Sequence, residues 1–196
     1  MSMFLGPIHY WLYEKINNQE KLTVKIAEYG QKNGWITNAE KYVKELPTLE
    51  TVIDTDNIHG WLQAQIADAE IRYAELVNAL VALDDTRIND IKEIAYDFGK
   101  SYALNMDANP EEAYKYFEDF FVNGMPCDHI NSIVSEDENK IIWKMEQDIH
   151  AQYWQNGDTR HYYVIRKAVM DGILAETKLT VVEEDLQNYS IMLKEI

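Results

Sequence analysis

The longest uninterrupted helical pattern in the sequence runs from Asp56 to Leu83 and contains no proline. Asp56 is a suitable N-cap residue, because its charge suits the positive end of the helix dipole. Asp68 and Arg72 are four residues apart on the polar side, so we expect them to face solvent and to pair across one turn. The apolar residues recur at helical spacing, which predicts a long amphipathic helix with one stripe: Ile58, Leu62, Ile66, Ala69, Tyr73, Leu76, Val77 and Leu80.

A line of polar residues borders this apolar stripe. His59, Gln63 and Glu70 follow one another along it, so imidazole, amide and carboxylate groups would converge toward the protein interior. One interpretation is that His59 and Glu70 keep their polar tips in solvent, because glutamate is rarely buried fully unless it is paired. The other is a ligand or metal site between helices, where carboxylates and histidines project inward. His59 and Glu70 are roughly 16 Å apart along the helix, so they cannot bind the same ion.

The rest of the chain divides into a helical part and a mixed part. Helical spacing and capping signals predict helices at 7–29, 38–46, 86–106, 110–124 and 161–175, and one further turn at 48–53. Short runs rich in Ile, Val and Trp predict a hairpin at 132–146 and closing strands at 179–182 and 189–193. The sequence therefore predicts a predominantly helical α+β fold in a single domain, 1–196. An N-terminal helical bundle spans 1–124, and an α+β subdomain with a small antiparallel sheet spans 125–196.

The composition limits the partners of the protein. The chain has 196 residues and a formal net charge of -16, spread along the sequence rather than gathered in a tail. This charge argues against nucleic acids and anionic membranes, which both attract basic surfaces. The first residues do not read as a secretory signal, and no apolar run reaches the roughly 18 residues of a membrane span. The single cysteine, Cys127, excludes an intramolecular disulfide and fits a reducing cytosol, so we expect a cytoplasmic protein.

Cys127, Asp128 and His129 form one polar cluster at a turn-rich junction. Each residue type can bind a metal or act in catalysis. Adjacent residues seldom converge on one point, however, and no second cysteine supports a structural zinc site. An ordinary loop with a capped helix end explains the same residues.

Glu146, Asp148 and His150 form a second polar cluster. In a strand these three residues share a face, and in a helix Glu146 and His150 are neighbours, so we expect a contact between Glu146 and His150 in either case. A carboxylate beside an imidazole can tune a general base or orient a metal-bound histidine. The alternative is a solvated edge strand, because such strands are commonly charged.

The C-terminal part also follows a known arrangement of elements. Residues 134–140 lead into a strand that ends at Asp148-Ile149-His150, and then come 151–154, a helix and two final strands. This order resembles the bacterial aminothiazoline carboxylate hydrolase family and the related four-vinyl reductase and haem-nitric-oxide-binding domains. The resemblance implies an α+β fold with a small-molecule pocket between sheet and helices. Asp148 stands where the family would have a cysteine, and neither His9 nor His59 matches a haem-ligand motif, so the resemblance implies neither thiol chemistry nor haem here.

Three functions are compatible with these patterns. The leading hypothesis is a protein that binds a small molecule between helices and sheet, since pockets combine apolar walls with a few convergent polar groups. A second hypothesis is a hydrolase or metal-dependent enzyme, with His150 as base or ligand and Glu146 orienting it. A third is a homodimer without a ligand, packed through the apolar segment 4–12. No phosphate-binding loop, Gly-x-Ser-x-Gly elbow or His-Glu-x-x-His motif is present, so neither a metal nor a cofactor is identified. The proposed binding residues are His59, Glu70, Asp148, Glu146 and His150 for polar contacts, and Trp61, Trp143 and Trp154 for the walls.

Overall fold

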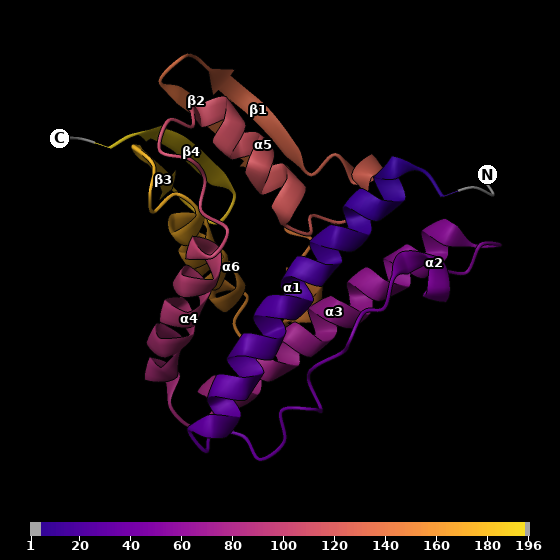
Figure 1. Ribbon diagram of the computed structural model, residues 1–196. Coiled ribbons are helices and arrows are strands. Elements are labelled where there is room, and N and C mark those ends of the chain that lie inside the picture. Colours follow the sequence, from indigo (N-terminus) through magenta and orange to yellow (C-terminus); the bar gives the residue numbers. More distant parts are fainter. Residues whose placement is uncertain (1–4, 195–196) are drawn as a thin grey trace.

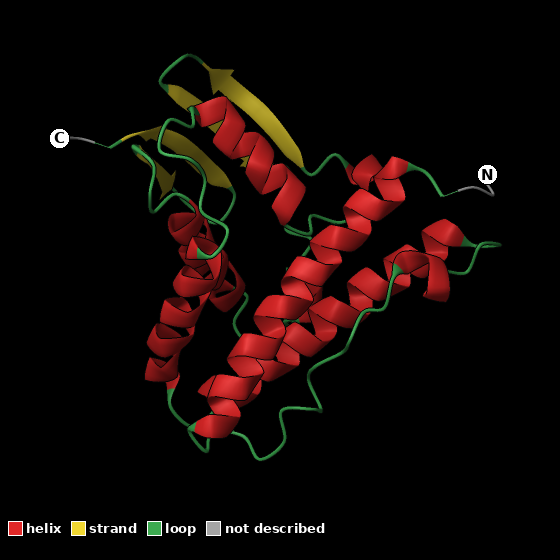
Figure 2. Cartoon of the chain, viewed as in Figure 1, coloured by secondary structure: helices red, strands yellow, loops and turns green. Residues whose placement is uncertain are grey.

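The computed structural model describes residues 5–194 and has a predominantly helical α+β fold, which confirms the predicted fold class (Figure 1). No helix in this range is both long and apolar enough to cross a membrane. The strands gather at one end of the molecule, as Figure 2 shows. The helices are α1 (Pro7–Lys32), α2 (Leu49–Val52), α3 (Ile58–Val81), α4 (Ile88–Lys100), α5 (Pro110–Phe120) and α6 (Arg160–Ile173), and the strands are β1 (Asn131–Glu136), β2 (Lys140–Met145), β3 (Leu179–Glu183) and β4 (Asn188–Leu193).

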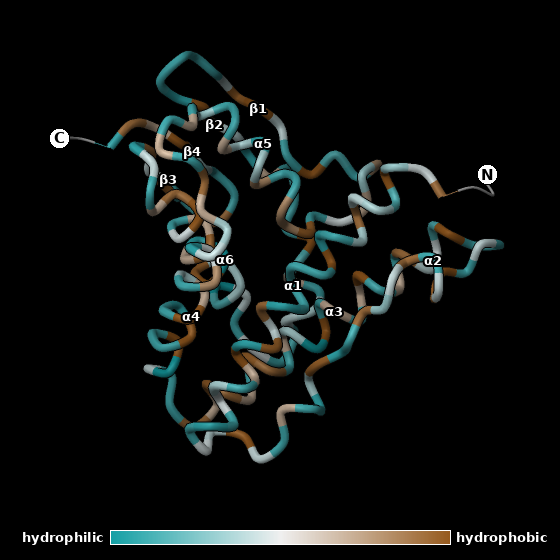
Figure 3. Tube along the Cα trace, in the orientation of Figure 1, coloured by the Kyte–Doolittle hydropathy of each residue, from teal (hydrophilic) through white to brown (hydrophobic). Residues whose placement is uncertain are grey.

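The long helix α3 packs along α1, and hydrophobic and hydrophilic residues interleave along both helices (Figure 3). All eight residues of the predicted α3 stripe are buried, so the helical pattern is confirmed. The N-cap is Asn57 rather than Asp56, because the Asn57 side chain accepts a hydrogen bond from the backbone N–H of Gly60 at 3.2 Å. The N-cap therefore lies one residue later than predicted.

Arg72 on α3 does not face solvent as the sequence predicted. It lies 3.1 Å from Asp68, as expected, but its guanidinium also forms a two-bond ion pair with Glu20 of α1. The side chains of Arg72 and Glu20 are only 13% and 5% exposed. The prediction was wrong because α1 covers this side of α3, which a helical period alone does not reveal.

The helix predicted at 38–46 is absent, and the helices predicted at 86–106 and 110–124 end early, at Lys100 and Phe120. Residues 39–42 form a bend and a turn, and residues 43–46 are irregular. Asn38 accepts a hydrogen bond from the Glu40 N–H, and Gln31 accepts one from the Ala39 N–H. These side-chain bonds compete with a helix. The helix predicted at 86–106 ends at Lys100, and the N–H of Leu104 then donates to the carbonyl of Ile173 at the end of α6.

The four strands form one antiparallel sheet in the order β1-β2-β4-β3. Successive side chains of a strand point to opposite faces, and β2 accordingly alternates between half-buried and buried residues. Helix α5 packs against β2 and β4, and α6 packs against β3. The buried face of the sheet and the helices thus share one core, which extends from Leu22 in α1 to Ile191 in β4.

Helices α4 and α6 cross in close contact at two glycines. A Cβ atom on Gly99 of α4 would lie 2.1 Å from the carbonyl oxygen of Val169, and one on Gly172 of α6 would lie 2.1 Å from that of Tyr96. Both obstacles are backbone atoms, so a side chain at either position would push the helices apart. This crossing fixes α6 and therefore the tyrosines at its first turn, which border the site described next.

Candidate functional site

Two ionisable side chains from distant parts of the sequence meet in the interior. Glu70 lies in the middle of α3, and His150 lies just before the 3₁₀ turn Ala151–Tyr153. The Asp148 carboxylate accepts hydrogen bonds from the N–H groups of His150 and Ala151, both at 3.0 Å, and so fixes the backbone of this turn. Because the turn packs against α3, Nδ1 of His150 lies 3.3 Å from Oε1 of Glu70. Both side chains are 1% exposed.

Aromatic rings from α6 and α3 surround this pair. The imidazole of His150 stacks on Tyr162 with a centroid distance of 3.8 Å, and Tyr163 contacts it edge-on. Burial raises the pKa of Tyr73, Tyr162 and Tyr153, and the nearby Glu70 carboxylate raises each further. These phenols therefore stay protonated at neutral pH, and their rings limit the access of water to the Glu70–His150 pair.

The hydrogen-bonding capacity of the pair is not used within the protein. Neither oxygen of Glu70 and neither ring nitrogen of His150 has a hydrogen-bond partner among residues 5–194, since the 3.3 Å contact lacks hydrogen-bond geometry. Most buried polar groups in proteins are paired, and each unpaired one costs about 1–3 kcal/mol. The pair therefore needs a partner from outside the described residues, such as water, an ion or a ligand.

A polar cavity of about 90 Å³ adjoins Glu70 and His150. It lies between α3 and the loop segments 122–128 and 149–153, so loops rather than strands form the wall opposite the helix. Gln63, Asp128 and Tyr153 supply further polar groups. None of the described residues that line it is a lysine or an arginine. The cavity therefore favours a small ligand that donates hydrogen bonds or carries positive charge.

Glu146 does not approach His150, so this predicted contact was wrong. Strand β2 ends at Met145, and the chain then turns, so the two side chains share neither a strand face nor a helix turn. Glu146 is exposed, accepts a hydrogen bond from Ser132 and lies 3.1 Å from Lys144. The carboxylate beside His150 is Glu70 instead. Asp148 is also exposed and acts as the turn cap described above.

The remaining predicted binding residues lie at several places. His59 is exposed and lies beside His9, away from Glu70, with ring centroids 5.7 Å apart. Trp61 is partly exposed and packs on a tyrosine of α1. Trp143 is buried under the sheet, where it stacks on Tyr189. Only Trp154, which contacts Tyr73 and Tyr162, lies in the aromatic surroundings of the Glu70–His150 pair.

The cluster of Cys127, Asp128 and His129 forms an ordinary turn. Cys127 is exposed, and the Asp128 carboxylate accepts a hydrogen bond from the N–H of Met125 at 2.8 Å. Among residues 5–194, no group of three His, Cys, Asp or Glu side chains is placed to hold a metal ion. Catalytic zinc sites use three protein ligands, so the donors of the Glu70 site do not fit such a metal.

Only part of the apolar N-terminal segment 4–12 is exposed on the surface. Phe4 lies outside the described residues. Leu12 is buried in the core, whereas Ile8 and Tyr10 are 49% and 41% exposed. The predicted homodimer through this segment stays a prediction.

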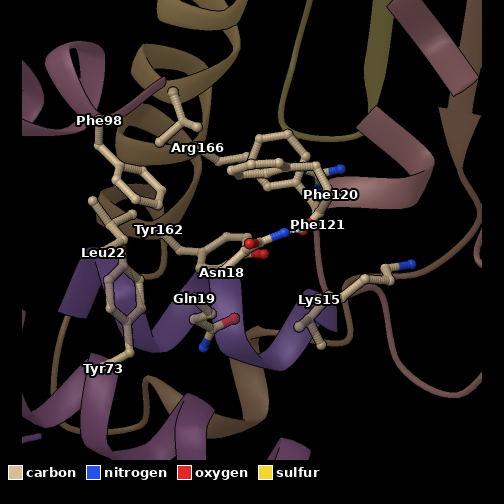
Figure 4. Close-up of a pocket in the computed structure, with 12 residues that line it drawn as sticks. Lys15, Asn18, Gln19, Leu22, Tyr73, Phe98, Phe120, Phe121, Tyr162 and Arg166 are labelled. Carbon is tan, nitrogen blue, oxygen red and sulfur yellow. Dashed lines mark hydrogen bonds between the residues drawn. The ribbon is translucent and has the colours of Figure 1, made fainter. Parts of the chain in front are cut away.

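Sequence reasoning missed two buried cations, Lys15 and Arg166, which are 3% and 4% exposed. Both border a narrow aromatic cavity of about 30 Å³ between α1, α5 and α6. Figure 4 shows the rings around this space and the Lys15 side chain directed away from them. The Arg166 guanidinium lies 5.1 Å from the Phe121 ring centre and contacts the sulfur of Met145. The sequence did contain an indication of their burial, because helical spacing places each of them on an apolar face. The two lines are Trp11-Lys15-Leu22 and Tyr162-Arg166-Val169.

The burial of Lys15 predicts a pH-dependent stability. Burial lowers the pKa of Lys15 from 10.5 to about 8; Glu118 and Asp119 oppose this effect and Arg166 adds to it. Between about pH 8 and 10.5 the unfolded chain holds a proton that the folded protein has released, so this group's contribution to stability increases with pH in that window. Replacing Lys15 with methionine is therefore expected to raise the free energy of unfolding at pH 7 by up to about 3 kcal/mol.

Urea denaturation at pH 7 and pH 10 measures this effect. The advantage of Lys15→Met is expected to shrink at the higher pH, whereas the exposed control Lys21→Met should change stability little at either pH. An equal advantage at both pH values would contradict a buried charged amine at position 15.

Comparisons of the chain with protein-family models, curated proteins and solved structures find no match. The resemblance to the aminothiazoline carboxylate hydrolase family therefore stays a prediction. The candidate site rests on its own geometry.

Proposed function

We propose that the protein binds a small organic cation, of the protonated primary amine class, in the cavity beside Glu70 and His150. The observation that carries this proposal is the Glu70 carboxylate, which is 1% exposed and has no lysine or arginine among the described residues of its cavity. An ammonium group has donors for the Glu70 oxygens and for the amide oxygen of Gln63. Bonds between charged partners are roughly twice as strong as neutral ones.

The surroundings support the same ligand class. The chain carries a net charge of -16, which attracts cations over distances beyond direct contact. The ring of Tyr153 lines the cavity and offers a face for a cation–π contact. Ile66 and Ile149 add apolar walls, so a short alkyl chain on the amine has a place to pack. We further propose a cytoplasmic location, supported by the single, exposed cysteine.

Calorimetric titration with propylammonium tests the proposal. Saturable binding is expected, with propan-1-ol, which has the same size but no charge, at least about tenfold weaker. The variant Glu70→Gln is expected to lose the preference for the amine, because it keeps the shape of the side chain but not its charge. Glu75→Gln serves as the matched control, since Glu75 is an exposed glutamate on the same helix. Equal affinity for amine and alcohol, or unchanged amine binding in Glu70→Gln, would refute the proposal.

A second candidate function is general acid–base catalysis with His150 as the base and Glu70, in place of Glu146, orienting its ring. The 3.3 Å contact between Nδ1 and Oε1 favours this candidate, since it leaves Nε2 as the reacting atom. Hydrolysis of p-nitrophenyl acetate provides a probe. His150→Asn is expected to lower kcat/KM at least about a hundredfold and to remove one apparent pKa from the pH profile. An unchanged rate in this variant would eliminate the catalytic role.

A further inference from the structure

A second polar cavity, of about 170 Å³, lies beside the segment that follows α5. Its wall comes from the first half of α1, the end of α5 and the loop that leads into β1. Lys15, Asn123 and Asn131 supply donors and acceptors to this cavity, and Trp11 forms an aromatic wall. The Glu118 carboxylate and His129 also line it. None of these polar residues lines the cavity at Glu70, so the inference is independent of the proposed function.

The Lys15 amino group has no carboxylate within ion-pair distance among residues 5–194, although its side chain is 3% exposed. The two acids nearest to it in α5 are held by other donors. Glu118 accepts a hydrogen bond from the Asn131 amide, and Asp119 accepts one from the Trp11 indole N–H at 2.8 Å. Lys15 instead lies 3.9 Å from the centre of the Trp11 ring. The ring face offsets only part of the cost of burying this side chain, so an anionic group in the cavity would stabilise the ammonium further.

Asn123 and Asn131 leave both donors and acceptors free in the same cavity. Asn123 is 8% exposed, and neither its amide nitrogen nor its amide oxygen has a partner within the described part of the chain. Asn131 uses its nitrogen to bind Glu118, but its buried oxygen has no partner there. A ligand that completes these bonds must therefore accept from Lys15 and Asn123 and also donate to at least one amide oxygen.

We propose that this cavity binds a small 2-hydroxycarboxylate. The carboxylate would accept hydrogen bonds from the Lys15 ammonium and the Asn123 amide nitrogen, and the neighbouring hydroxyl would donate to the oxygen of Asn123 or Asn131. Asn131 already donates to the Glu118 carboxylate, which lines the same cavity, so the ligand hydroxyl would bind the amide oxygens rather than Glu118. The side chain of the ligand would pack on Trp11 and Ile130.

Three molecules of similar size test the carboxylate and the hydroxyl of the proposed ligand separately. Lactate carries both groups, propionate lacks the hydroxyl, and propane-1,2-diol lacks the carboxylate. In NMR titrations of the full-length protein, lactate is expected to shift the Trp11 indole N–H signal saturably. Propionate is expected to bind at least about tenfold more weakly, because the amide oxygens stay unpaired. Propane-1,2-diol is expected not to bind.

Variants identify the binding site. Lys15→Met is expected to abolish lactate binding while the protein stays folded, because methionine fills the buried position without a charge. Asn123→Ala tests the second contact and is expected to weaken binding at least about tenfold. Lys21→Met, on the exposed side of α1, should bind lactate as the wild-type protein does. An absent or non-saturable shift, equal binding of lactate and propionate, or unchanged lactate binding in Lys15→Met would each overturn the proposal.

Discussion

Replacing His150 alone with leucine is expected to destabilise the protein by about 3 kcal/mol, because the buried Glu70 carboxylate then loses the basic side chain that lies 3.3 Å from it. Replacing Glu70 and His150 together with leucine is expected to leave the stability unchanged or to raise it by up to about 3 kcal/mol, because two buried polar groups without hydrogen bonds are replaced by apolar side chains of similar volume. The adjoining cavity of about 90 Å³ accommodates the slightly larger side chains. The double variant is also expected to lose amine binding completely.

Chemical denaturation of the wild-type protein, the two single variants and the double variant forms a double-mutant cycle that measures the coupling directly. A stability gain that accompanies the loss of binding is typical of residues retained for function. If the double variant is as unstable as the sum of the two single variants, then the pair does not interact, and Glu70 and His150 are independent parts of the core.

Alanine at either glycine of the α4–α6 crossing is expected to destabilise the protein by about 3 kcal/mol, the upper part of the range for overpacked cores. The added Cβ atom would lie 2.1 Å from a backbone carbonyl oxygen at both Gly99 and Gly172, and backbone atoms cannot move aside as a flexible side chain can. In an exposed helix the same substitution would stabilise the protein by about 1 kcal/mol. A loss of stability therefore indicates that the two helices are in close contact at these glycines.

Thermal and urea denaturation of Gly99→Ala and Gly172→Ala measure this effect. Lys92→Ala is the matched control, because Lys92 is exposed on α4 and its replacement is expected to change stability by less than about 0.5 kcal/mol. The double glycine variant should lose less than the sum of the single losses, since the first substitution already separates the helices. A stabilising effect at Gly99 would show that the helices do not cross as closely as described.

Periodicity was enough to predict the secondary structure where local signals agreed. The stripe on α3 is buried as predicted, and the hairpin predicted at 132–146 from residues rich in Ile, Val and Trp is formed by β1 and β2. The helix predicted at 38–46 does not form, because the side chains of Asn38 and Gln31 accept hydrogen bonds from backbone N–H groups there. Whether side chains compete for the backbone in this way depends on where the preceding helix ends. The spacing of apolar residues within 38–46 carries no information about that position.

The candidate site was only half predictable. Glu70 stood out because it borders an apolar stripe, and His150 because it follows two acids, but their pairing joins residues from α3 and from a turn beyond β2. Local spacing favoured Glu146 as the partner, and the end of β2 at Met145 removes that contact. Lys15 and Arg166 were missed although each lies on an apolar line, because a single charged residue on a stripe is usually read as an interruption.

The most direct test of the account is NMR observation of the His150 imidazole during titration with propylammonium. The account predicts that the His150 ring signals shift saturably, with the dissociation constant found by calorimetry, while the exposed His59 ring signals stay in place. Binding that saturates by calorimetry without any shift of the His150 signals would place the ligand elsewhere and contradict the proposed site.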